Sequence, residues 1–128
     1  DDATMEDGLD VFEYQMRIVH NTDIIQVIND LKNADAEAIS INGHRIVDNS
    51  EVYCSGPFLR VNGIKIAAPF LIDAIGNKDI LYNYMISNEN YLKTMMIRKI
   101  KVNVEKSDNI QIPAYNGEYK VHFMQRKN

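Results

Sequence analysis

Two Asn-Gly pairs constrain this chain more than any other feature of its sequence. Asn42-Gly43 and Asn62-Gly63 each interrupt a run of alternating apolar residues. Asn and Gly both tolerate the positive φ angles of a type I′ turn, which joins two antiparallel strands through two residues. The sequence therefore predicts two β-hairpins, 38–41/44–47 and 58–61/64–66, with a polar connection over 48–57 between them.

Two helices are predicted from apolar residues that recur with helical spacing. The first is capped by Thr22 or Asp23 and ends near residues 33–35. Its apolar residues are Ile24, Ile25, Val27, Ile28 and Leu31. The second helix is capped by Asn77 and is broken near Ser87-Asn88. Its expected inner face consists of Ile80, Leu81, Tyr84 and Met85, followed after the break by Tyr91, Leu92, Met95 and Met96.

Further strands are predicted where apolar and polar residues alternate or where a short apolar run is bounded by turn residues. These segments are 69–75, 100–105 and 119–123, with a short extended piece at 110–113. Near the N-terminus the only comparable pattern is a short extended piece around residues 16–19.

The order of these elements defines the expected fold. Residues 1–21 are predicted to form an irregular N-terminal segment without a convincing strand, and residues 22–128 to form a single α+β domain. The domain formed by residues 22–128 should contain two helices packed on a mainly antiparallel sheet. The nearest common arrangement is ferredoxin-like, with the β-hairpins as insertions.

Charge and composition exclude several classes of function. The net charge of −4 argues against nucleic acid as a partner, because phosphate binding needs clustered Lys and Arg. Cys54 is the single cysteine, so the chain has no internal disulfide and no C-x-x-C motif. No apolar run reaches the roughly 20 residues that span a bilayer, and no signal peptide is recognisable. The chain itself is therefore expected to be soluble.

No motif for catalysis, cofactor binding or metal binding stands out. The chain lacks G-x-G-x-x-G, a Walker loop, G-x-S-x-G and H-E-x-x-H. Cys54 with His44 and Asp48 is a conceivable nucleophilic site, but a small apolar thiol beside a turn explains Cys54 better. His20 and Asp23 have the spacing of two metal ligands, yet helix capping explains them better. We therefore predict no catalytic, cofactor-binding or metal-binding residue.

Four charged residues nevertheless attract interest. Arg60 and Lys65 should stand opposite each other in the second hairpin, and two like charges at such positions are mildly destabilising. Either both side chains extend into water, or an acidic partner offsets their repulsion; in the second case Arg45, Arg60 and Lys65 form the predicted partner surface. Asp73 interrupts an apolar strand, so its carboxyl is either partly buried with a raised pKa or on an exposed face.

Several segments of the chain resemble one bacterial family of uncharacterised proteins, the YlxW/YlxX-like family (domain of unknown function 881). The segments AEAISING, from Ala36 to Gly43, and IPAY, from Ile112 to Tyr115, are the most specific. The others lie within residues 19–35, 44–47, 50–57, 61–63, 68–72 and 74–76. Asp35 stands where family members usually have Gly after the first helix, and Asp tolerates the left-handed conformation expected there.

The resemblance implies a membrane-anchored protein with one transmembrane helix, a coiled coil and this domain on the extracytoplasmic side of the membrane. It also implies a link to cell division or wall assembly in Gram-positive bacteria, and it brings no catalytic residue and no cofactor. Asp1-Asp2-Ala3 resembles the segment that follows the family's first strand. We therefore expect that strand to be missing, which would expose a sheet edge and favour a homodimer by sheet-edge pairing.

Three hypotheses of function follow. The first is a non-catalytic interaction or scaffold domain that binds a protein partner at the cell envelope. The second is a small-ligand-binding sensor domain with a pocket near Cys54 and the turn at residues 55–57. The third is a hydrolase that uses Cys54 as its nucleophile.

Overall fold

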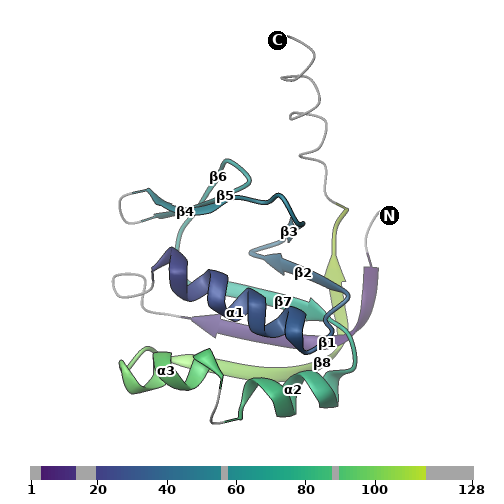
Figure 1. Ribbon diagram of the computed structural model, residues 1–128. Coiled ribbons are helices and arrows are strands. Elements are labelled where there is room, and N and C mark those ends of the chain that lie inside the picture. Colours follow the sequence, from purple (N-terminus) through teal and green to yellow (C-terminus); the bar gives the residue numbers. More distant parts are fainter. Residues whose placement is uncertain (1–3, 14–19, 56–57, 88–89, 115–128) are drawn as a thin grey trace.

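A computed structural model of the chain describes residues 4–13, 20–55, 58–87 and 90–114 (Figure 1). Within these residues the fold is α+β, with three helices and two antiparallel sheets. The helices are α1 (Asn21–Asn33), α2 (Lys78–Met85) and α3 (Tyr91–Ile97). The larger sheet contains β1 (Thr4–Glu13), β2 (Ala38–Ile41), β3 (His44–Ile46), β7 (Phe70–Ile75) and β8 (Val102–Ile112). The smaller sheet contains β4 (Val52–Ser55), β5 (Phe58–Val61) and β6 (Ile64–Ile66).

Strand β1 lies inside the larger sheet, whose order is β3-β2-β7-β1-β8. It pairs antiparallel with β7 on one side and with β8 on the other. The prediction of an irregular segment over residues 1–21 is therefore wrong for residues 4–13, and so is the expectation of a missing first strand. The extended piece expected at 16–19 and the strand expected at 119–123 lie outside the described residues.

A glycine explains part of that error, because Gly8 interrupts the alternation that would have revealed β1. The structure requires glycine at this position: a Cβ atom on Gly8 would collide with the backbone carbonyl oxygen of Ala74 in β7. The β1–β8 register also shifts between Glu6 and Gly8, as at a β-bulge.

Helix α1 confirms the predicted apolar face, since Ile24, Val27, Ile28 and Leu31 are buried whereas Ile25 is exposed. The N-cap is His20 rather than Thr22 or Asp23. The carboxylate of Asp23 still binds the helix start, because it accepts a hydrogen bond from the His20 backbone N–H at 2.9 Å. Asp35, with a φ of 66°, has the left-handed conformation expected after this helix.

The second predicted helix is two helices, so the described fold has three rather than two. Asn77 caps α2 as predicted: its side chain accepts hydrogen bonds from the backbone N–H groups of Asp79 and Ile80 at 3.0 and 3.1 Å. Only Leu81 and Met85 of α2 are buried, and only Leu92 and Met95 of α3. Ile80, Tyr84 and Met96 were expected on the inner face and are exposed instead. Each short helix turns a single stripe toward the sheet.

Both Asn-Gly hairpins form as predicted, with Ile39 opposite Ile46 and Leu59 opposite Ile66. The φ angles at the four turn residues are 47° and 84° in the first pair and 53° and 81° in the second, as a type I′ turn requires. The polar connection predicted over 48–57 contains strand β4, which pairs with β5. Its exposed Tyr53 and Cys54 hid the strand, because they break the alternation.

The three helices lie on one face of the larger sheet (Figure 1). Helix residues and sheet residues such as Leu9, Val11, Ile72 and Ala74 form one buried cluster, and Leu59, Val61 and Ile66 of the smaller sheet join it. Because side chains alternate along a strand, the residues between them point to the opposite, helix-free face. No helix within the described ranges is long and apolar enough to cross a membrane.

Candidate functional site

The predicted partner surface is divided between the two sheets. Arg60 and Lys65 stand opposite each other in β5 and β6, as expected, whereas Arg45 lies in β3 of the larger sheet. Arg60 donates to the carbonyl of Gly63 at 3.0 Å, and the Lys65 ammonium lies 4.9 Å from the ring centroid of Phe58. Each cation thus has a contact within its own hairpin. The repulsion that suggested an acidic partner is thus partly relieved within the hairpin.

The residues proposed for nucleophilic or metal chemistry have other contacts. The exposed Cys54 thiol lies 3.4 Å from the side-chain oxygen of Asn21 and accepts from the Asn21 backbone N–H at 3.3 Å. These are the contacts described for Cys54, and neither His44 nor Asp48 is among them. Within the described ranges, no group of three His, Cys, Asp or Glu side chains is arranged to hold a metal ion.

The buried carboxylate of Asp23 is the centre of a polar cluster that joins α1 to α3. Its carboxylate accepts hydrogen bonds from Arg98 at 2.6 Å and from the Tyr91 hydroxyl at 2.5 Å, in addition to the His20 N–H. Burial by itself raises the pKa of Asp23, but these three hydrogen bonds and the charge of Arg98 outweigh it, so the pKa lies below its usual value. The contacts with Tyr91 and Arg98 join α1 to α3, whereas the contact with His20 lies at the start of α1.

A row of polar side chains crosses the helix-free face of the larger sheet. Its members are successive cross-strand neighbours: Arg45, Ser40, Asp73, Asp10 and Glu105. Ser40 is fully buried, and within the described part of the chain its hydroxyl and one oxygen of Asp73 have no hydrogen-bond partner. Burial first, then a hydrogen bond with Asp10 and the charge of Asp10, raise the pKa of Asp73 from 3.8 to about 8.

This row resolves the alternatives left open for Asp73, because its carboxyl is half-buried and its pKa is raised. The Asp10–Asp73 pair therefore holds a proton at neutral pH. Arg45, at the end of the row, donates to the carbonyl of Pro113 at 3.4 Å. The sequence indicated Asp73 by itself; its partner Asp10 became visible only when the register of β1 and β7 was known.

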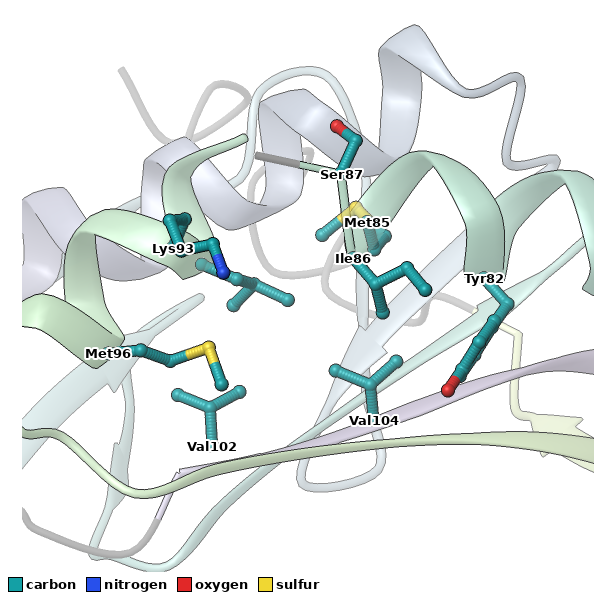
Figure 2. A pocket seen from close by; sticks show the side chains of 9 residues that line it. Tyr82, Met85, Ile86, Ser87, Lys93, Met96, Val102 and Val104 are labelled. Carbon is teal, nitrogen blue, oxygen red and sulfur yellow. The ribbon is translucent and has the colours of Figure 1, made fainter. Parts of the chain in front are cut away.

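A groove of about 350 Å³ lies between α2, α3 and strand β8 (Figure 2). Figure 2 shows the side chains of Ile86 and Met96 pointing toward Val104 and Val102 of β8. The other lining residues are Tyr82, Met85, Ser87, Leu92 and Lys93. Ile86 and Met96 are 49% and 51% exposed, so the apolar lining is open to solvent.

The groove runs beside the β8 edge of the larger sheet. Strand β8 is the terminal strand of the larger sheet and, in the described chain, pairs only with β1. Val102 and Val104 therefore belong both to the groove and to the edge. We use the name edge groove for the groove together with residues 101–105, which comprise Lys101 and the first four residues of β8. Sequence patterns missed it because they assigned Met96 to a buried helix face.

Within the described residues, the fold and this site define an α+β domain in which an unpaired strand edge lies beside an apolar groove. The chain belongs to the family described as bacterial protein of unknown function (DUF881), whose family model matches residues 1–125. The resemblance seen in the sequence is thereby confirmed.

One curated relative illustrates this membership, and one solved structure shares the fold. The chain is 33% identical over 112 residues to the UPF0749 protein YlxW of Bacillus subtilis (strain 168). That match covers 88% of this chain and 47% of YlxW, so the chain spans about half the length of this relative. The fold is similar to the crystal structure of an uncharacterized conserved protein from Mycobacterium tuberculosis, with a TM-score of 0.80 and 24% identity. The likeness covers 88% of this chain and 82% of that chain.

Proposed function

We propose that this domain is a non-catalytic interaction module of a membrane-anchored bacterial envelope protein, acting on the extracytoplasmic side in cell division or wall assembly. The observation that carries the binding role is the edge groove, where apolar side chains adjoin a strand edge that has no partner in the described chain. A partner strand that adds to such an edge gains main-chain hydrogen bonds, while the groove accepts its side chains. The envelope role rests on the family resemblance.

The composition of the groove favours binding over catalysis. Its polar members are Tyr82, Ser87 and Lys93, and the rest of its lining is aliphatic or methionine. Methionine side chains adapt to different partner surfaces, which suits a protein-binding groove. The Cys54 thiol contacts Asn21, which is not a general base. Full biological activity of a Cys54→Ala variant would exclude the hydrolase hypothesis.

We also infer that the scaffold is ferredoxin-like. Two βαβ units, β1-α1-β2 and β7-α2-α3-β8, interlock to give the antiparallel order β2-β7-β1-β8. That order supports the inference, because it is the order of a split βαβ repeat. Strands β3 to β6 then constitute the inserted hairpins, and β8 becomes an edge strand.

Photo-crosslinking in living cells tests the interaction role. A crosslinking amino acid replaces Met96 at the edge groove in the intact protein, and in a matched control it replaces Tyr53, which is 44% exposed on the smaller sheet. We expect defined protein adducts from position 96 and none of the same mass from position 53. The proposal is wrong if position 96 gives no adduct at any stage of growth.

A charge-reversal variant tests the partner surface that the sequence predicts, which includes Arg60 and Lys65. Adducts from position 96 should persist when Arg60 and Lys65 are both replaced by Glu, because these residues lie in the smaller sheet. Loss of the adducts in that variant would show that the partner binds the surface formed by Arg45, Arg60 and Lys65. A topology reporter fused to the domain tests the extracytoplasmic location.

A small-ligand sensor is the second candidate function, and the volume of the groove favours it. About 350 Å³ lies within the range of roughly 300–1,000 Å³ found for small-molecule sites. This groove lies between α2, α3 and β8, not at the predicted position near Cys54. A thermal-shift screen with nucleotides, amino acids and wall fragments tests this function. No stabilisation at millimolar ligand would exclude it for those classes.

A further inference from the structure

We propose that the edge groove binds a second copy of this chain, through antiparallel pairing of two β8 strands about a two-fold axis at Asn103. This inference rests on the proposed interaction role and names the partner. In the described sheet, β8 is an edge strand of eleven residues, whereas β3 at the opposite edge has only three residues. A long exposed edge is a ready template for pairing with another chain.

Charge complementarity selects this register. A two-fold axis at Asn103 places Lys101 of one copy opposite Glu105 of the other, and the symmetry repeats the pair. Both residues are exposed, and Glu105 belongs to the helix-free face because it pairs with Asp10. Lys101 directly precedes β8, and continuing the alternation of the strand by one residue puts it on the same face. Moving the axis by one residue in either direction separates Lys101 from Glu105. The axis at Asn103 therefore gives two symmetric ion pairs.

Apolar complementarity on the other face agrees with the same register. The axis at Asn103 places Val102 opposite Val104 of the second copy, and both residues are only half-buried in a single chain. These valines line the groove beneath Met96 and Ile86, so pairing would bring the grooves of the two copies together. Apolar side chains that are 49% and 51% exposed in one copy would then become covered.

The continuous sheet would contain ten strands, five from each copy. A two-fold axis perpendicular to the sheet keeps all helices on one face, so the helix-facing valines of both copies meet. Asn103 would face its own equivalent, and in the single chain its side-chain amide already donates to Glu105 at 2.9 Å. That hydrogen bond holds Glu105 alongside the edge where Lys101 of the second copy would lie.

Single charge reversals test the register. Lys101→Glu and Glu105→Lys each turn both symmetric pairs into like-charge pairs, and each should weaken self-association measured by sedimentation equilibrium about tenfold or more. Asp48→Lys, at an exposed residue before β4, is the matched control and should leave self-association unchanged. Circular dichroism melting of each variant confirms that the fold is intact.

Mixing the two variants gives the decisive result. The K101E copy is acidic at both positions 101 and 105, and the E105K copy is basic at both, so an equal mixture should form a heterodimer visible by native mass spectrometry. The double variant K101E/E105K should recover the wild-type homodimer. The inference is overturned if the wild-type chain stays monomeric at hundreds of micromolar, or if mixing restores nothing. Adducts to other proteins from position 96 would still support the interaction role in that case.

Discussion

Replacing Asp73 by Asn should stabilise the protein at alkaline pH. Asp73 and Asp10 lie opposite each other on β7 and β1, and their proximity and burial raise the pKa of Asp73 to about 8. In the unfolded chain the same carboxyl has its ordinary pKa of 3.8. Between these two values the folded protein holds a proton that the unfolded chain releases.

The sign of the pH dependence follows from this difference. Because the folded state binds more protons, the stabilising contribution of the protonated Asp73 is fully present below about pH 4 and is lost as the pH rises through about 8. The full difference corresponds to about 6 kcal/mol at 1.36 kcal/mol per pH unit. Asp73 is only half-buried, so solvent screening reduces the expected change to about 2–3 kcal/mol.

Urea denaturation at pH 5 and pH 9 measures the effect. The wild-type free energy of unfolding should fall by about 2–3 kcal/mol between these values, beyond any change in a matched Asp48→Asn control. Asp73→Asn should lose this dependence and should exceed wild type by about 2 kcal/mol at pH 9, because an amide carries no charge to desolvate. Asp10→Asn should likewise reduce the change in the free energy of unfolding between pH 5 and pH 9. An Asp73→Asn variant with wild-type pH dependence would refute the shared-proton explanation.

Three further predictions concern the scaffold. Arg98→Ala should cost about 2–3 kcal/mol in urea denaturation, because it leaves the buried carboxylate of Asp23 without its guanidinium partner. Gly63→Ala should cost about 1 kcal/mol in the same assay, since its φ is 81° although an added Cβ atom would meet no other atom within 4 Å. Gly8→Ala should cost about 3 kcal/mol or more, seen as a lower midpoint in thermal circular dichroism, because its Cβ would collide with the carbonyl oxygen of Ala74.

Local chemistry explains which elements the sequence revealed. The Asn-Gly turns need positive φ angles that few other pairs adopt, so both hairpins could be predicted with their registers. Helix α1 could be predicted because its buried residues have a clean helical period over three turns. Asn77 was recognisable as a cap because its side-chain oxygen accepts from the backbone two and three residues later.

Features that depend on long-range pairing stayed hidden. Strand β1 has only Leu9 and Val11 buried on the helix side in its described centre, while Asp10 and Gly8 interrupt the pattern. Its place between β7 and β8 is set by partners more than 50 residues away along the chain. The carboxyl pair was hidden for the same reason, since Asp10 and Asp73 meet only through that pairing.

The apolar residues that the sequence placed in the core but that are exposed in the structure indicate a surface for interaction. Ile80, Tyr84 and Met96 were expected in the core because of their helical spacing, yet they are 56%, 36% and 51% exposed on α2 and α3. These are the helices that border β8, the long strand at the edge of the described sheet. An apolar pattern that exceeds what one chain can bury is typical of a surface that a partner covers. Of these three residues Met96 lines the groove beside that edge, so Met96 and the β8 edge belong to the one interface that the proposed self-pairing of β8 would cover.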